Sequence, residues 1–452
     1  MHGRARTLRI CRGALHTSLV LLLLSLSPDH PQIGSWDVRR HLLSTSTVAR
    51  RGATMATSPK LFPSPEARSH NAANRWTTRI IPIFLLAVIG FACWALTKPI
   101  CSECNSADPN RTTQKLRRDE RNTGSANTTC RTHTVDFFIA RNQLGSAIVL
   151  LVLHYIFLIL MLVCYARTLY TVTYDPGVVP LEPKLGLESF YTRDFYTCRS
   201  DGLPIWCSDC QNWKPDRAHH SGEIQRCVQK MDHYCPWAGG MIGESAFKFF
   251  IQFVTYTACY CSICLSAGAL VTRTLANEGK DVSVPAIVLV AFSAFFGLFS
   301  FTMAAMSHGY ALSNITNIEN LSRRTKVHQL AIRIPLNQTP NSDNSAMPND
   351  YETITFPLAN PNFDGNQFIY ENQNGANRAS QHAPEHKFAI VKTEVGENPW
   401  DMGSYYQNWK SVMGDKGVLD WLLPLRLSPC CNYNGEYPTG PVVDRLRESL
   451  KK

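Results

Sequence analysis

The chain has 452 residues, enough for two or three domains, and its mean hydropathy is near neutral because strongly apolar blocks alternate with polar ones. The formal net charge of +10 favours partners that carry negative charge, such as anionic lipid and phosphate groups. Nucleic acid is disfavoured as a partner, because the sequence lacks a recognition motif of basic and aromatic residues. The sixteen cysteines do not form a secreted disulfide framework, since many sit in apolar segments or in one short cluster.

The N-terminal extension, residues 1–79, begins with a basic, serine-rich stretch. Its apolar run 19–26 is too short to span a membrane but fits the apolar region of a targeting signal. Alternatively, translation begins at Met55, because the sequence that follows makes a complete membrane protein without residues 1–54. We therefore expect residues 1–54 to be either a targeting segment or untranslated.

Four apolar stretches are predicted to be transmembrane helices, and they cover residues 80–96, 145–165, 247–271 and 284–306. The polar loop 97–143 separates the first two helices of the region 80–165 and is expected in the lumen, where its sequons at Asn110 and Asn127 can carry glycans. Its lysines and arginines argue against the lumen, a conflict that an inserted or mis-spliced segment near 105–135 would explain. The second pair occupies residues 247–306. The fold class is thus an α-helical polytopic membrane protein.

Residues 166–246, between the second and third helices, contain the ligands of a metal site. Cys207 and Cys210 form a C-x2-C pair, and His220 and Cys227 complete the four ligands of a tetrahedral zinc site. Spacing alone leaves this assignment open, because three more side chains are of ligand type: His219, His233 and Cys235.

The remaining run, residues 232–235, has the chemistry of an activated nucleophile. Pro236 disfavours the helical region for Cys235, so residues 233–235 are expected to be extended, with His233 and Cys235 on one face and Tyr234 on the other. An imidazole beside a thiol favours the thiolate, and Asp232 can fix the tautomer of His233 if the chain bends there. The alternative is that Cys235 is a further metal ligand or a buried thiol.

The same segment resembles the cysteine-rich domain of the DHHC protein S-acyltransferases, the palmitoyltransferases. The resemblance rests on four runs: Cys207-x2-Cys210, Lys214-Pro215-Asp216-Arg217-Ala218-His219-His220, Cys227-Val228 and Met231-Asp232-His233-Tyr234-Cys235-Pro236-Trp237. It implies that Cys235 takes an acyl group from acyl-CoA and passes it to a protein cysteine. Tyr234 in place of the family's histidine looks like a fungal branch that retains activity.

The resemblance also implies two zinc ions, of which we expect this chain to keep one. The first site maps onto Cys207, Cys210, His220 and Cys227. The four positions of the second site hold residues that are not usual zinc ligands: Ser221, Ile224, Tyr234 and Met241. Because the whole coordination sphere is replaced, Ile224, Tyr234 and Met241 are predicted to pack where the metal would be.

Three more motifs of the family are recognisable outside the cysteine-rich segment: Asp175-Pro176-Gly177, the TTxE-like run 314–319 with Thr316 and Glu319, and a C-terminal PaCCT-like segment 398–414 with Asn408. The TTxE-like run is expected to brace the catalytic segment by hydrogen bonds, and the PaCCT-like segment to pack on the membrane helices. Within the tail 307–452, residues 335–381 are predicted to be a disordered linker and residues 388–392 a strand.

The sequence therefore predicts a multi-pass enzyme of an endomembrane or the plasma membrane, which S-palmitoylates cysteines of membrane-associated proteins through a Cys235 thioester. The catalytic segment faces the cytosol, because acyl-CoA is cytosolic. Lys214, Arg217 and Lys230 are candidates for contacting the CoA phosphates, although each can equally be a surface charge. The alternative function is a weakly active or inactive membrane scaffold stabilised by zinc, favoured by the replaced second site and by Ala246, where the family usually has asparagine.

Overall fold

The computed structural model describes residues 65–97, 137–139, 141–282, 284–337, 351–356 and 385–451. The chain divides into two units, Met1–Ala73 and Asn74–Lys452, and the features below belong to the second unit, apart from the helical residues 65–73. The N-terminal stretch 1–54, the two sequons of the loop 97–143 and most of the expected linker 335–381 lie outside the described residues.

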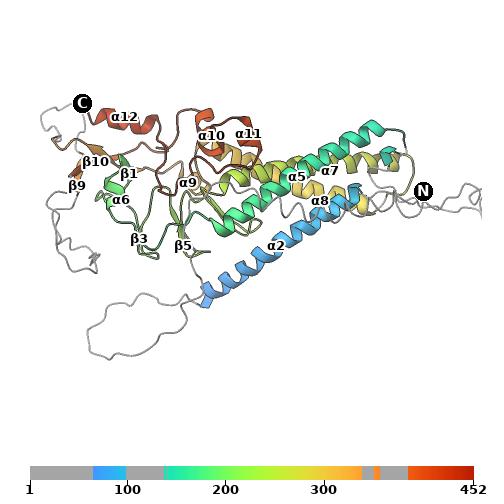
Figure 1. The fold of residues 1–452 in the computed structure, drawn as a ribbon, viewed down its shortest axis with the longest axis horizontal. Helices are drawn as coiled ribbons and strands as arrows, with labels where there is room; N and C mark the ends of the chain where they lie inside the picture. The colour runs from blue at the N-terminus through green and yellow to red at the C-terminus, as the bar shows by residue number, and fades with distance from the viewer. Residues whose placement is uncertain are drawn as a thin grey trace, which may run out of the picture. The chain divides into compact units, whose positions relative to one another are not determined.

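Four long helices confirm the predicted membrane spans (Figure 1): α2 (Pro65–Thr97, with its apolar part at Ile80–Thr97), α5 (Leu144–Tyr174), α7 (Phe247–Asn277) and α8 (Val284–Ser313). Helix α5 continues past the expected end at residue 165, because neither glycine nor proline interrupts the chain before Pro176. Each of the four is long and apolar enough to cross a membrane.

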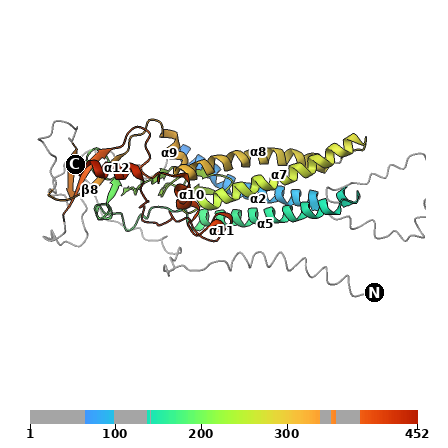
Figure 2. The same cartoon turned by 90° about the horizontal axis from the view of Figure 1, so that it is seen from above.

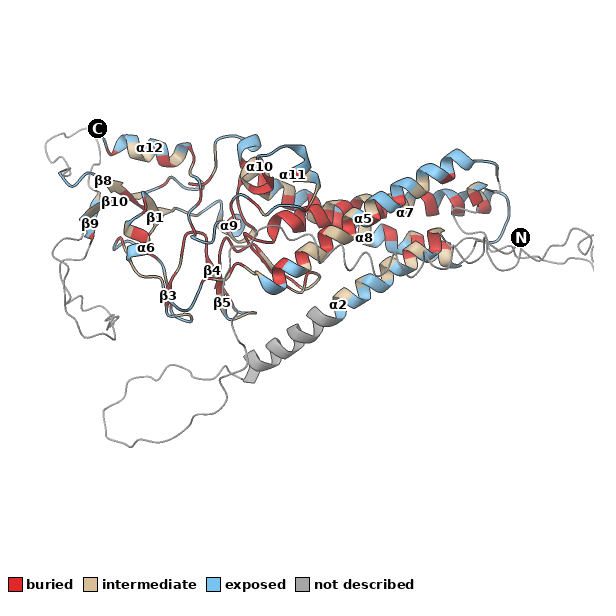
Figure 3. Cartoon of the chain, viewed as in Figure 1, coloured by how far each residue is buried: buried red, intermediate tan, exposed pale blue. Residues whose placement is uncertain are grey.

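Helix α7 is the centre of the bundle, since it packs against both α5 and α8. Half of its most apolar window is buried, against 28% for α5 and 22% for α8. Figure 3 shows the buried positions gathered in the first half of α7, where the adjoining ends of α5 and α8 meet it. The exposed side chains of α5 and α8 are mostly aliphatic or aromatic, as expected of surfaces that face lipid.

Three short hairpins follow α5, in the segment that leads to α7. They are β2 (Trp206–Cys207) with β3 (Asn212–Trp213), β4 (His219–Ser221) with β5 (Arg226–Val228), and β6 (His233–Cys235) with β7 (Gly240–Ile242). A short helix, α6 (Glu188–Tyr191), precedes them. Strands this short are not stable as isolated hairpins, so their stability must come from the groups packed between them.

A four-stranded antiparallel sheet of order β1-β8-β10-β9 joins this segment to the tail. Its strands are β1 (Phe195–Thr197), β8 (Gln329–Ile334), β10 (His386–Lys392) and β9 (Glu352–Phe356). Strand β10 contains the strand predicted at 388–392. Strand β9 corrects the prediction that all of 335–381 is disordered: Phe356 is 1% exposed and packs with Phe388, while Ile354 packs on the same cluster. The alternating pattern around Ile354 is that of a half-buried strand.

Four short helices complete the fold: α9 (Asn317–Ser322), α10 (Tyr405–Met413), α11 (Val418–Leu422) and α12 (Pro441–Ser449). Helix α10 packs on α8, and buried Asn408 donates from Nδ2 to the carbonyl of Leu312 at 2.8 Å. Its Oδ1 accepts from the amide of Met402 at 2.8 Å. The PaCCT-like segment therefore packs on the membrane helices, as predicted.

Candidate active site

The four predicted metal ligands lie together at the base of two hairpins. Cys207 ends β2, Cys210 follows in the turn, and His220 and Cys227 are directly paired across β4 and β5. Their ligand atoms all lie within 4.8 Å of one another, and His220 Nδ1 is 3.6 Å from Cys207 Sγ and 3.3 Å from Cys210 Sγ. Thiolates bound to one tetrahedral zinc at ~2.3 Å stand ~3.8 Å apart. This thiol cluster therefore fits a zinc ion.

The structure brings together only one of the alternative ligand sets among the described residues. In the part of the chain that it describes, the thiol cluster is the one group of three or more Cys, His, Asp or Glu side chains that can hold a metal ion. Neither His219 nor Cys235 belongs to it. Cys235 lies instead in the apolar core of the membrane bundle, with Phe250 and Val254.

The four positions of the family's second zinc site are packed together without ligand groups. Met241 is 1% exposed, and Ile224 and Tyr234 contact the same buried cluster, which also contains Val228. Ser221 Oγ donates to Met241 Sδ at 3.3 Å. We call this group of side chains the apolar cluster. Its arrangement agrees with the predicted packing, whereas the number of zinc ions stays a prediction.

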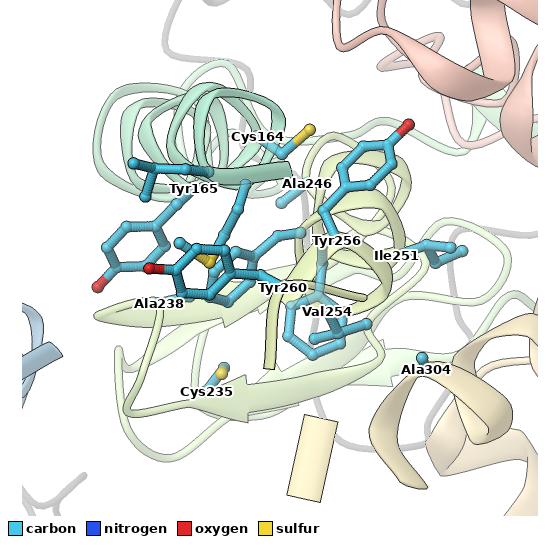
Figure 4. Close-up of a cluster of buried hydrophobic side chains, with 14 of the residues drawn as sticks. Cys164, Tyr165, Cys235, Ala238, Ala246, Ile251, Val254, Tyr256, Tyr260 and Ala304 are labelled. Atoms are coloured by element: carbon cyan, nitrogen blue, oxygen red, sulfur yellow. The ribbon is translucent and has the colours of Figure 1, made fainter. Parts of the chain in front are cut away.

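The candidate nucleophile lies on strand β6, which is extended as predicted from Pro236. In the pairing of β6 with β7, Cys235 is opposite Gly240 and Tyr234 is opposite Met241. His233 and Cys235 face the bundle, where the His233 ring contacts Phe250, and Tyr234 faces the apolar cluster. Figure 4 shows Cys235 on its strand beside the buried cluster of the bundle.

Glycine at position 240 allows this hairpin to approach helix α5. A Cβ atom at Gly240 would lie 2.5 Å from Cγ1 of Val172. Real Cβ atoms do not come so close to a neighbour, so a larger residue would push β7, and with it Cys235, away from the helix.

Asp232 orients the ring of His233, its neighbour in the chain. His233 Nδ1 donates to Asp232 Oδ2 at 2.6 Å, and Asp232 Oδ1 accepts from the backbone amide of Asn317 at 2.8 Å. The other ring nitrogen, Nε2, is buried and has no hydrogen-bond partner among the described residues. The shared proton is therefore held on Nδ1, which leaves Nε2 as the nitrogen available to a neighbouring thiol.

The pKa of His233 reflects two opposed effects. Burial of the ring lowers the pKa. The hydrogen bond to Asp232 and the neighbouring Cys235 thiol raise the pKa by more than burial lowers it, so that it reaches about 9. At neutral pH the imidazole is therefore protonated in the folded protein.

The TTxE-like run braces the catalytic strand, as predicted. Thr316 caps α9 and forms a capping box with Glu319, which fixes the amide of Asn317 against Asp232. Arg217 donates to both carboxylate oxygens of Glu319, at 2.7 and 2.6 Å. Burial alone would raise the pKa of Glu319, but the charge of Arg217 and its hydrogen bonds lower it to about 2. Glu319 thus stays ionised and the pair stays intact.

Two of the three candidate CoA contacts are interior groups, which corrects the prediction. The side chain of Arg217 is fully buried in its pair with Glu319. Lys230 is 4% exposed and donates to Asn314 Oδ1 at 3.2 Å and to Cys430 Sγ at 3.4 Å. Spacing did not reveal this, because the partners lie 84 to 200 positions away in the sequence. Only Lys214 keeps an accessible side chain.

The motif at 175–177 ties the end of α5 to the hairpins. Gly177 has φ +64°, a conformation that favours glycine, and its carbonyl accepts from the amide of Gln229 at 2.9 Å. Ser245 Oγ donates to the carbonyl of Asp175 at 2.7 Å, and the hydroxyl of Tyr433 donates to the Asp175 carboxylate. The motif is therefore a structural junction between the membrane helices, the hairpins and the tail.

Tyr165 is a site residue that the sequence did not single out. Its hydroxyl donates to the carbonyl of Trp237 at 3.0 Å, and its ring stacks on Phe253 with centroids 4.7 Å apart. It therefore holds the turn that follows Cys235 against α5 and α7. A tyrosine in an apolar helix gave no signal of this role, since most such residues are interhelix packing groups.

Two cavities lined by described residues are relevant to substrate binding. An apolar cavity between the membrane helices is lined by Tyr165, Phe253, Tyr260 and Leu289. A larger cavity of about 460 Å³ lies between β1, β8 and the β4 strand, and several basic and imidazole side chains are among its lining residues. These are Arg217, His219, Lys326, His328 and Lys392.

Comparison with known proteins assigns the family. The chain is 33% identical to palmitoyltransferase pfa5 of Aspergillus fumigatus over 437 residues, which is 83% of this chain and 90% of that protein. It belongs to the DHHC palmitoyltransferase family. A family model described as DHHC palmitoyltransferase matches residues 202–324, which contain the thiol cluster, β6 and α9. Palmitoyltransferase pfa5 of Emericella nidulans is 32% identical, covering 83% of this chain and 86% of its own length.

A more distant relative shares the central part of the chain. Palmitoyltransferase PFA5 of Saccharomyces cerevisiae is 30% identical over 269 residues, 56% of this chain and 65% of that protein. The palmitoyltransferase assignment and the four-helix membrane fold with an intervening cysteine-rich segment are thus confirmed. Nothing in the comparisons or in the described residues favours the alternative of an inactive scaffold.

Proposed function

We propose that this DHHC family member transfers a long-chain acyl group from acyl-CoA to cysteines of membrane-associated proteins, by a ping-pong reaction through a thioester on Cys235. The observation that supports this most is the set Asp232, His233 and Cys235. The carboxylate holds one imidazole nitrogen at 2.6 Å, and the thiol lies on the same face of β6 as that imidazole. This is the arrangement of an activated cysteine nucleophile.

In the first half-reaction, His233 holds the proton of Cys235, and the thiolate attacks the thioester carbonyl of acyl-CoA. A new C–S bond forms to Cys235, the C–S bond to CoA breaks, and the leaving CoA thiolate takes the proton from His233. In the second, His233 accepts the proton of a substrate cysteine, whose thiolate attacks the acyl-enzyme. Cys235 leaves and is reprotonated through His233. Asp232 keeps the imidazole in one tautomer during both halves.

We assign the two cavities to the two parts of acyl-CoA. Burying a sixteen-carbon chain is worth roughly 10 kcal/mol at ~0.8 kcal/mol per CH₂ group, so the chain will lie in apolar surroundings. The apolar cavity beside Tyr165 and Tyr260 has a volume of about 60 Å³ and can hold only part of it, so the rest would lie along the membrane helices. The CoA phosphates would be bound by Lys326 and Lys392 at the larger cavity, and Lys214 is the neighbour in sequence of Pro215, which lines it. Arg217 and Lys230 are reassigned to holding the fold.

The remaining expectations follow from the substrate. Acyl-CoA is cytosolic, so the segment between α5 and α7 faces the cytosol and the chain resides in an endomembrane or the plasma membrane. One zinc ion would be held by Cys207, Cys210, His220 and Cys227. When bound, it would cross-link the β2–β3 turn to the β4–β5 hairpin, a structural contribution without a part in acyl transfer.

Labelling of the purified enzyme with clickable palmitoyl-CoA tests this function. Cys235→Ala should reduce the label to background, because it removes the attacking atom. Cys431→Ala is the matched control, since this thiol lies outside the site and should leave the label unchanged. Mass spectrometry of the labelled peptide identifies the modified residue. A wild-type level of label on the Cys235→Ala variant would refute the proposal.

A further inference from the structure

Helix α11 and the turn after it expose a row of aliphatic side chains. The exposed fractions are 58% for Val418, 68% for Leu419, 48% for Leu422 and 55% for Leu425. The opposite side of the helix is fixed to the protein, because Trp421 packs against the core of the bundle. Helix α11 is therefore amphipathic with its apolar side outward, which is unusual for a surface in contact with water.

Hydrogen bonds to α7 fix the level of α11 relative to the membrane. Tyr256 donates from its hydroxyl to the carbonyl of Leu422 at 2.6 Å, and Gln252 Nε2 donates to the carbonyl of Trp421 at 2.9 Å. Helix α7 has 31 residues and is ~46 Å long at ~1.5 Å per residue, whereas the hydrocarbon core is ~30 Å thick. A polar turn follows Asn277 at once, so about ten residues at the other end lie outside the hydrocarbon. Tyr256, and Leu422 with it, then lies at the boundary.

Helix α8 independently indicates the same position of the membrane boundary. Its exposed apolar side chains run from Val284 to Met306 and then stop. The next turn carries His308, whose ring stacks on Trp409 of α10 with centroids 5.4 Å apart. Helix α10 thus begins where the lipid-facing surface of α8 ends. Figure 2 shows α10 and α11 beside the same end of the helix bundle.

The residues around α11 match this level. Lys416 precedes it and Arg426 follows Leu425, and both are exposed. Tyr405 and Tyr406, at the start of α10, are 72% and 59% exposed. Aromatic rings are enriched at the membrane interface, and lysine and arginine at this level reach the lipid phosphates.

We propose that α11 and the turn to Leu425 insert into the bilayer surface, with Leu419, Leu422 and Leu425 among the upper parts of the acyl chains. The occupant of this face is lipid, because the face is continuous with the lipid-facing surface of the bundle. The insertion also bears on the active site. The segment after α11 is fixed by Ser428 Oγ, which donates to the carbonyl of Val412 at 2.6 Å. It continues to Cys430, the partner of Lys230.

Fluorescence quenching in nanodiscs tests the insertion on the full chain. An environment-insensitive fluorescent amino acid is placed at position 419, and the quencher is a phospholipid with a doxyl group at carbon 5. Two positions serve as controls. Leu298 is 72% exposed on the membrane face of α8, and Leu336 is 53% exposed beyond β8. We expect quenching at 419 to be at least threefold stronger than at 336 and similar to that at 298.

Quenching at 419 no stronger than at 336 would overturn the proposal, as would protection from aqueous iodide without lipid quenching, which would mean that a protein covers the face. The same measurement at 425 guards against local distortion by the probe, because both positions must give the lipid signal. The readout is independent of acyl transfer. The result therefore stands even if Cys235 proves not to be the acylated residue.

Discussion

The thiol cluster and the apolar cluster are two solutions to the same structural problem. Each must hold short hairpins together, and the β4–β5 hairpin contributes to both. His220 and Cys227 turn toward the thiols, while Ser221 and Val228 turn toward Met241. The first cluster brings together groups that repel or oxidise without a metal, whereas the second is complete in itself. The comparison teaches that the catalytic strand is held by packing and hydrogen bonds, and that a metal bound at the thiol cluster would support only the neighbouring hairpin.

The largest effect should come from breaking the thiol cluster. Cys227→Ser removes one ligand, and structural zinc contributes ~10–16 kcal/mol of apparent folding energy in small domains, comparable to the whole stability of a domain. We expect loss of the bound zinc and of protease resistance in the segment 166–246. Elemental analysis should give close to one zinc per wild-type chain and close to none for the variant. Cys431→Ser is the control, and a wild-type value near two would contradict the replaced second site.

The apolar cluster should lose stability when a cavity is created in it. Met241→Ala removes a side chain that is 1% exposed, and such truncations cost ~2–5 kcal/mol. Thermal unfolding in detergent should show this loss while the zinc content stays unchanged. Met306→Ala, on the exposed side of α8, is the matched control and should have little effect. An equal effect of the two substitutions would mean that the apolar cluster does not hold the hairpin.

Titration of His233 should make the stability of the protein depend on pH. Its pKa rises from ~6.5 in the unfolded chain to about 9 in the folded protein, so its protonation stabilises the fold by at most about 3 kcal/mol. That contribution is fully present below pH ~6.5 and is lost as the pH rises through about 9.

Asp232→Asn tests this dependence. It keeps an oxygen for the Asn317 amide but removes the charge that raises the His233 pKa, so the variant's stability should change less between pH 6.5 and 9.5 than that of the wild type. Thermal unfolding across this range measures the difference, with the exposed Asp444→Asn as control. Parallel curves for wild type and Asp232→Asn would contradict the assigned role.

The smallest effect is expected at Tyr165. Tyr165→Phe removes only the hydrogen bond to the Trp237 carbonyl, which is worth ~1 kcal/mol. The rate of label transfer to Cys235 should fall roughly fivefold, the equivalent of ~1 kcal/mol, with zinc content and overall fold retained. Tyr170→Phe, on the exposed side of α5, should leave the rate unchanged. Equal rates for the two variants would show that the turn after Cys235 is held without this contact.

Features set by neighbours in the sequence could be predicted, and those set by distant partners could not. The apolar runs predicted the four helices, and Pro236 predicted the extended strand at 233–235. The spacing of Cys207 and Cys210 predicted one edge of the thiol cluster, although the choice among further ligands needed the resemblance or the structure. In each case the physical cause acts within a few residues.

The missed features all depend on long-range contacts. In the sequence Arg217 is a plausible phosphate ligand. Only the structure shows that it is paired with Glu319. The sequence of strand β9 was predicted to be linker, because its few apolar residues are buried only by pairing with β10 and by contact with Phe388. Tyr165 is separated from Trp237 by 72 positions, and nothing in the sequence around either residue indicates that the two are in contact. These are consequences of tertiary packing, which local patterns do not encode.

The C-terminal tail is synthesised last, so its contacts with the catalytic segment form late. Tyr437 supplies the hydroxyl that Glu244 accepts, and the two are 193 positions apart. At ~5–20 residues per second, translation separates their emergence by roughly 10–40 s. During that interval the carboxylate of Glu244 and the ammonium of Lys230 lack their partners from the tail. A transcript truncated before codon 430 would therefore yield a membrane-inserted product with an unfinished catalytic hairpin, a natural target for quality-control proteases.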